Sequence, residues 1–101
     1  MASEKIPTLA FDSAEYLDTD EAICAYLDEA LATDDPAFIA QALGTVARAR
    51  GMSSIAKESG LSRESLYKAL GAEGNPAFGT VIRVMQALGL RLSVSTVAPN
   101  P

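Results

Sequence analysis

Residues 52–70 read Met52-Ser-Ser-Ile-Ala-Lys-Glu-Ser-Gly-Leu-Ser-Arg-Glu-Ser-Leu-Tyr-Lys-Ala-Leu70, and they predict two short helices that meet at a tight turn. Ala56 supplies the small side chain needed where two helices cross, and Gly60 can adopt the left-handed conformation that a three-residue turn demands. This pattern is typical of a helix-turn-helix. The alternative is a helical hairpin that does not bind DNA. The apolar residues spaced to form a small core between the helices are Ile55, Leu61, Leu66, Ala69 and Leu70.

The second helix of this pair carries the candidate DNA contacts. In a helix-turn-helix the N-terminal, outward side chains of that helix face base edges in the major groove. Arg63 could donate two hydrogen bonds to guanine, and Glu64 could accept one from cytosine. The outward positions are Ser62, Arg63, Glu64, Ser65, Tyr67 and Lys68. Hydroxyl and cationic side chains suit phosphates, and we assign that role to Ser53, Ser54, Ser62, Lys57 and Lys68, with Arg48 or Arg50 as further cations. Asn75 is a weaker phosphate candidate because it lies just before a helix start.

Three longer helices are predicted around the pair. Apolar residues recur every three or four positions in residues 20–31, 36–50 and 77–88, which indicates amphipathic helices. The two short helices cover residues 53–59 and, after a cap at Ser62, extend to residue 70. Asp35 and Pro36 are typical of an N-cap and a first helical residue. We expect Phe38 and Phe78 to be buried, one near the start of each of two long helices.

The C-terminal segment has a different periodicity. Residues 90–97 alternate in polarity, which predicts a short β-strand. A lone strand leaves backbone groups unpaired, and pairing with the same strand of a second copy would satisfy them by two-fold symmetry. We therefore expect a homodimer, unless the tail packs on its own chain or frays. The expected interface residues are Leu90, Leu92, Val94 and Thr96.

The composition fits one small helical domain over residues 1–101. Hydrophobic residues make up 49% of the chain, but 18 of them are Ala, the strongest helix former. No apolar run approaches the length of a membrane span, and the N-terminus lacks the apolar stretch of a secretory signal. We therefore expect an all-α protein with a short C-terminal strand, located in the cytoplasm and without a membrane segment.

Several kinds of chemistry are excluded by residue type. Histidine is absent, Cys24 is the only cysteine, and no phosphate-binding glycine motif is present. An internal disulfide and a cysteine-based zinc site are therefore impossible, and the usual general base is missing. We expect no catalytic residue, no metal and no cofactor, and therefore no enzyme. We interpret Cys24 as a small buried apolar residue on a helix.

The net charge of −5 conceals two oppositely charged parts. Residues 1–40 hold ten acidic residues and one basic residue, a net of −9, whereas residues 41–101 have a net of +4. This asymmetry is typical of a nucleic-acid-binding part joined to an acidic part, although acids can also simply solvate a helix face. We divide the chain into an acidic N-terminal region (1–35), a helix-turn-helix core (36–89) and the C-terminal strand (90–97).

Over residues 10–95 the chain resembles probable addiction-module antidote proteins, which are antitoxins of the xenobiotic-response-element class of helix-turn-helix regulators. The most specific block is Gly60-Leu-Ser-Arg-Glu-Ser-Leu-Tyr-Lys-Ala-Leu70. The other blocks are Tyr26-Leu-Asp-Glu-Ala30, Asp35-Pro-Ala-Phe-Ile-Ala-Gln-Ala-Leu43, Val46-Ala-Arg-Ala-Arg-Gly-Met52, and Gly74-Asn-Pro76 through Ala87-Leu-Gly-Leu-Arg-Leu92.

The resemblance implies a five-helix, lambda-repressor-like fold and binding to double-stranded operator DNA in the protein's own promoter. It also implies a partner toxin of the RelE/ParE type, a small basic protein encoded beside it. An acidic segment could dock such a surface by charge complementarity. We therefore expect toxin contacts at Asp18, Asp20, Glu21, Asp28 and Glu29. The alternatives are a helix-turn-helix repressor without a toxin partner, and a protein-interaction module whose helix-turn-helix has no DNA role.

Overall fold

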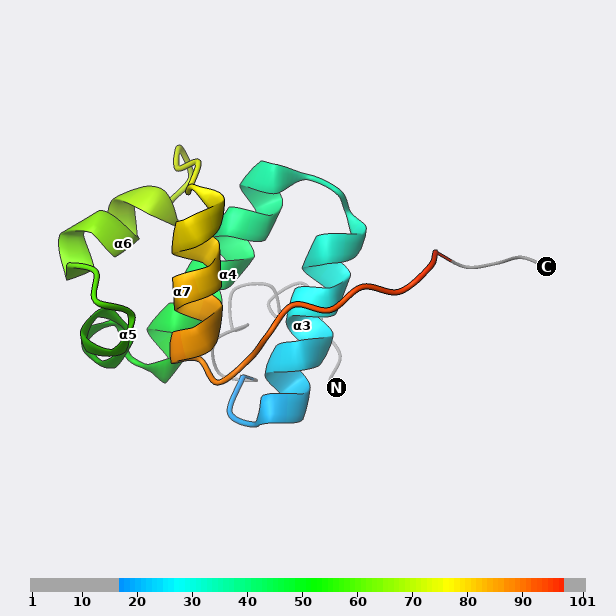
Figure 1. Ribbon diagram of the computed structural model, residues 1–101, viewed down its shortest axis with the longest axis horizontal. Coiled ribbons are helices and arrows are strands. Elements are labelled where there is room, and N and C mark those ends of the chain that lie inside the picture. The colour runs from blue at the N-terminus through cyan, green and yellow to red at the C-terminus, as the bar shows by residue number, and fades with distance from the viewer. Residues whose placement is uncertain (1–16, 98–101) are drawn as a thin grey trace, which may run out of the picture.

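The computed structural model describes residues 17–97, which form five α-helices (Figure 1). Each predicted helix is found within two residues of its expected bounds, so the prediction of these five helices is confirmed over residues 17–97. Residues 1–16 of the predicted acidic region lie outside the described residues. None of the described helices combines the length and apolarity needed to cross a membrane. The helices are α3 (Asp20–Ala32), α4 (Pro36–Arg50), α5 (Met52–Ser59), α6 (Arg63–Ala69) and α7 (Phe78–Ala87).

Side-chain caps explain where α3 and α4 begin. Thr19 accepts a hydrogen bond from the backbone N–H of Ala22 at 3.0 Å, before α3. Asp35 accepts from the N–H groups of Ala37 and Phe38, before α4, and Pro36 follows it as the first helical residue. Each cap satisfies backbone donors that the first helical turn leaves unpaired, and such a cap is worth about 1 kcal/mol.

The core lies where α4 and α5 meet α6, α7 and the inner face of α3. α3 runs beside α4, and α5 contacts α4, α6 and α7. The α5 residues Met52, Ile55 and Ala56 are buried in this core. The side chains with essentially no solvent exposure come from α3, α4, α7 and α6 with its C-cap. They are Ile23, Leu43, Val46, Leu66, Leu70 and Val84. Because every helix contributes to one buried cluster, each short helix is held by packing rather than by its own propensity.

The turn between α5 and α6 has the three-residue form that the sequence predicts. Gly60 has φ of 78°, in the left-handed region, where a residue with a side chain would be strained. The N–H groups of Gly60 and Leu61 both donate to the carbonyl oxygen of Ala56, at 3.0 and 3.2 Å. The buried Ser59 hydroxyl donates to the same oxygen and accepts from the N–H of Leu61. This network sets the angle between the two helices.

A second glycine brings α4 against the end of α6. A Cβ on Gly44 would stand 2.7 Å from the carbonyl oxygen of Leu70 and 3.2 Å from the Leu70 Cβ. The obstacle is partly backbone, so it cannot rotate aside. Gly44 therefore permits a close approach of α4 to α6 that any larger residue would prevent. The packing of these two helices was not part of the sequence-based expectations.

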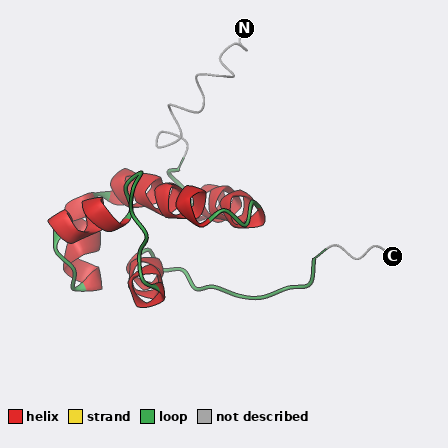
Figure 2. Cartoon of the chain, turned by 90° about the horizontal axis from the view of Figure 1, so that it is seen from above, coloured by secondary structure: helices red, strands yellow, loops and turns green. Residues whose placement is uncertain are grey.

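The predicted C-terminal strand is wrong. Residues 90–97 contain no strand; they cross α3 and then leave the body of the domain, as Figures 1 and 2 show. Alternating polarity describes an extended chain, but a strand also requires a hydrogen-bonded neighbour, and no described segment lies alongside. Val94 is 98% exposed. The segment is extended without forming part of a sheet.

Three predictions of burial are also wrong. Phe78 is 71% exposed and Phe38 is 46% exposed, and Cys24 is exposed as well. Each of these residues falls at the edge of an apolar helical stripe, close to a helix end or to a face that no other helix covers. Periodicity identifies the apolar face of a helix, but which part of that face is covered depends on neighbouring helices.

Two helical glycines provide a matched test of the α4–α6 contact. Gly44→Ala should lower the free energy of unfolding by about 1–3 kcal/mol, because the added methyl meets the backbone of Leu70. Gly79→Ala, in α7 with nothing within 4 Å, should raise it by about 0.5–1 kcal/mol through helix propensity alone. Urea unfolding followed by helical circular dichroism measures both. Equal stability of the two variants would contradict the account of this contact.

Candidate functional site

The exposed face of α6 gathers the side chains that the sequence predicts to contact bases. Every residue from 62 to 68 is exposed except Leu66, which faces the core. Arg63 and Tyr67 lie one turn apart, with the guanidinium carbon 5.9 Å from the centre of the ring. A cation over an aromatic face is weakly attracted to it, which favours an ordered Arg63 at the start of the helix.

The hydroxyl groups at this surface are not equivalent. Ser62 accepts a hydrogen bond from the N–H of Ser65 at 3.0 Å and donates to the Ser65 hydroxyl at 2.9 Å. It is therefore the N-cap of α6, and its first role is to start that helix. Ser53 and Ser54 are exposed in the first turn of α5, where no side chain caps the helix. Lys57 is exposed on the same helix.

Arg83 is a cation that sequence reasoning left out of the candidate site. It is exposed on α7, and its Nη1 would lie 3.9 Å from a Cβ placed on Gly60. Its guanidinium therefore lies beside the turn between α5 and α6. The residue is 23 positions beyond that turn in the chain, so no local pattern could have assigned it there; only the packing of α5 against α7 brings the two together.

Asn75 is placed differently from the other predicted DNA contacts. It is exposed in the loop between α6 and α7, and with Pro76 it lines a groove that is otherwise apolar. No residue of α5 or α6 lines that groove. The structure therefore brings nine of the ten predicted DNA contacts to the α5–α6 unit and puts Asn75 at the edge of a separate surface.

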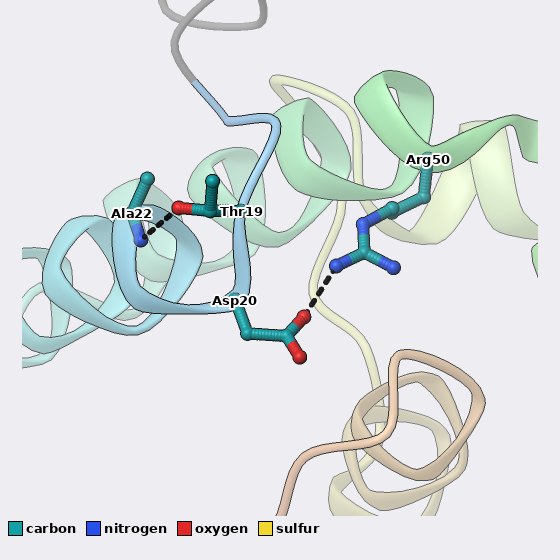
Figure 3. A network of polar contacts seen from close by, with 4 residues as sticks. All are labelled: Thr19, Asp20, Ala22 and Arg50. Carbon is teal, nitrogen blue, oxygen red and sulfur yellow. Dashed lines mark hydrogen bonds and ion pairs between the residues drawn. The ribbon is translucent and has the colours of Figure 1, made fainter.

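The acidic residues predicted to hold a toxin are all exposed, on α3 or just before it. Asp20 has a partner within the chain: its carboxylate lies 2.6 Å from the guanidinium of Arg50 (Figure 3). This ion pair joins the beginning of α3 to the end of α4. Both side chains are at least one-third exposed, so the pair adds little stability, but it neutralises one acid and one candidate phosphate contact.

An apolar groove of about 250 Å³ lies between α3, α4 and the beginning of α7. Its walls include the exposed Phe78 and the partly exposed Leu31 and Leu92. Sequence analysis did not predict this groove, because the same apolar side chains are equally expected in a core. The remaining lining residues are Leu27, Pro36, Ile39, Ala40, Leu43, Asn75, Pro76, Val81 and Met85.

The predicted dimer residues divide into two pairs. Leu90 packs against the hydrophobic core, and Leu92 lines the apolar groove, so both face their own chain. Val94 and Thr96 lie beyond the groove and are exposed. Within residues 17–97, no group of three or more acidic or cysteine side chains is arranged to hold a metal ion.

Comparison with known proteins identifies the family. The family model for the probable addiction module antidote protein matches residues 7–96, nearly the whole chain. The chain is also similar to an uncharacterized protein of Haemophilus influenzae, with 54% identity over 84 residues, which cover 83% of this chain and 87% of the relative. No solved structure matches it significantly. A match of this extent leaves no large part of the chain outside the family: this protein belongs to the probable addiction module antidote proteins.

Proposed function

We propose that this protein is the antitoxin of a type II toxin–antitoxin module. In this proposal it binds and neutralises a small basic toxin of the RelE/ParE type, and it represses its own operon by binding promoter DNA through α5 and α6. The observation that carries the proposal is the family match over residues 7–96, since an antidote implies a toxin partner. The protein acts by binding and not by catalysis.

The distribution of charge supports two separate binding faces. Residues 17–47 contain no basic residue at all, whereas the exposed cations Lys57, Arg63, Lys68 and Arg83 belong to α5, α6 and α7. Phosphates attract the cationic end of the molecule, and a basic protein is attracted to the acidic end. A net charge of −5 is therefore compatible with DNA binding, provided that α3 is turned away from the duplex.

The second candidate is a helix-turn-helix repressor without a toxin partner. The short turn at Gly60 and the exposed α6 favour it equally, because DNA binding does not require a toxin. A third candidate, a protein-interaction module whose helix pair has no DNA role, is favoured only by the overall negative charge. A gel shift on the native promoter separates this third candidate from the other two.

Growth measurements test the antitoxin proposal directly. Inducing the small reading frame that adjoins this gene should arrest growth, and co-expression of this protein should restore it, because the complex removes free toxin. Viable counts with and without co-induction provide the measurement. A harmless neighbour, or an arrest that this protein does not relieve, would contradict the proposal and favour the stand-alone repressor.

Arg63→Ala tests the DNA-binding face. If Arg63 reads guanine, its loss should weaken binding to the promoter by about 1–3 kcal/mol and relax discrimination at one base pair. Arg91→Ala removes the same charge from the exposed tail and should leave promoter affinity close to that of the wild type. Titrations on promoter variants and unrelated DNA give both values. A uniform loss on all sequences would show a phosphate contact, and no loss would contradict the assignment.

We further propose that two copies bind together, because helix-turn-helix proteins commonly read two half-sites one DNA turn apart. Val94 and Thr96 are exposed and available for contacts between copies. Sedimentation at micromolar concentration should give the mass of two chains, and Val94→Asp should shift it toward one by placing like charges at the contact. The mass of a single chain for the wild-type protein would contradict the dimer.

A further inference from the structure

The apolar groove continues beneath the C-terminal tail. A second hollow, lined in part by tail residues 90–93, shares four lining residues with the groove: Leu27, Leu31, Met85 and Leu92. The two hollows are therefore one surface, which the tail crosses at Leu92. In Figure 1 the orange tail leaves α7 and passes in front of α3, the two helices that, with α4, contribute lining residues. Below, "the groove" means this continuous surface.

The groove is open because α7 is held mainly by α5. The helix contacts in the structure join α7 to α5 and α3 to α4, so α3 and α7 stand on opposite walls with little direct contact. Phe78 at the end of one wall is 71% exposed, and Leu31 on the other is 38% exposed. Contiguous apolar surface of this kind on a small soluble domain marks a site where another molecule binds. An amphipathic helix laid in such a groove buries its apolar face.

The acidic residues beside the groove indicate which kind of molecule binds there. Asp28 lines the groove directly, between Leu27 and Leu31 on the same face of α3. The turn after α3 adds Asp34 and Asp35, both exposed, next to the groove residue Pro36. The one basic side chain in the lining is Arg91, on the tail. A segment with an apolar face and basic flanks would be complementary to this surface, because its apolar face would meet the apolar lining and its basic residues would meet the acidic residues beside it.

A second copy of this chain fits the groove less well. Apposing two such grooves would bring the acids of two α3 helices together, in chains that each carry a net charge of −5. If the cationic α6 surface of one copy bound in the groove of the next, the contact would be head-to-tail. Such contacts build open filaments, unless the rotation between successive copies closes them into a ring. Neither arrangement satisfies both the apolar lining and the charge in a closed pair.

We infer that the groove between α3, α4 and α7 is the docking site for a basic amphipathic helical segment of the toxin. This inference rests on the antitoxin function proposed above and adds to it the site and the chemistry of the partner. It assigns the anchoring contact to Phe78 and the main electrostatic contact to Asp28, and it gives no role to Glu29. Because no residue of α5 or α6 lines the groove, the proposed DNA-binding face stays free when the toxin is bound.

Two matched pairs of variants test this assignment in the full-length protein. Phe78→Ala removes an exposed phenylalanine ring from the groove, and Phe38→Ala removes an exposed phenylalanine ring that does not line it. Asp28→Asn and Glu29→Gln each remove one negative charge from adjacent positions of α3, but only Asp28 lines the groove. All four side chains are exposed, so helical circular dichroism should confirm that each variant folds.

The measurement is the dissociation constant of each variant for the purified product of the adjoining reading frame, by isothermal titration calorimetry. Phe78→Ala should weaken binding about tenfold or more, as expected when an exposed aromatic ring is buried by the partner, and Phe38→Ala should not. Asp28→Asn should weaken binding and reduce its dependence on salt, whereas Glu29→Gln should leave the salt dependence unchanged. In a gel shift, the wild-type complex with this product should still bind promoter DNA.

Three other outcomes would contradict the groove assignment, the antitoxin proposal or the identity of the bound molecule. If the wild type binds its neighbour's product and Phe78→Ala and Phe38→Ala bind equally well, the groove assignment is overturned while the antitoxin proposal stands. If the wild type does not bind that product, the antitoxin proposal fails and the groove assignment falls with it. If Phe78→Ala instead lowers the mass of the free protein in sedimentation from two chains to one, the occupant is a second copy and the inference is wrong.

Discussion

The arrangement of this protein depends on the close approach of α4 to the end of α6. Gly44 has no side chain, so the carbonyl oxygen and Cβ of Leu70 can lie against the α4 backbone. Leu66 and Leu70 then reach the core formed by α4, α5 and α7, and the short α6 is held with its polar face outward. A helix of seven residues would not persist in water by itself. The exposed face of α6 is thus a consequence of packing at Gly44.

The same packing separates the two charged ends of the molecule. α6 and the turn at Gly60 lie at one end, with Arg83 brought beside them by the contact of α7 with α5. α3 lies at the other end, where Asp20 pairs with Arg50 and the other acidic residues of the helix are exposed. A protein that must hold both a polyanion and a basic partner requires this kind of separation, because either partner would otherwise be repelled by the groups that attract the other.

Local rules predicted the helices well because each has explicit start and stop signals. Asp35 and Pro36 begin α4, Gly51 ends it, and Ser62 caps α6, as the structure confirms. The same rules failed for Phe78, Phe38 and Cys24, because apolar periodicity describes one helix and burial requires a second element. The predicted strand failed for a related reason: residues 90–97 have the alternation of a strand but no neighbour to pair with.

The amino-acid sequence by itself determined the five helices, the three-residue turn at Gly60 and the separation of acidic from basic residues. The helices and the turn depend on neighbouring residues, and the charge separation follows from counting acidic and basic residues along the chain. Only the tertiary structure decided the contact at Gly44, the position of Arg83 beside the turn, and the apolar groove between α3, α4 and α7. Each of these depends on the distance between helices that are far apart in the chain, and side-chain volumes throughout the core set that distance together.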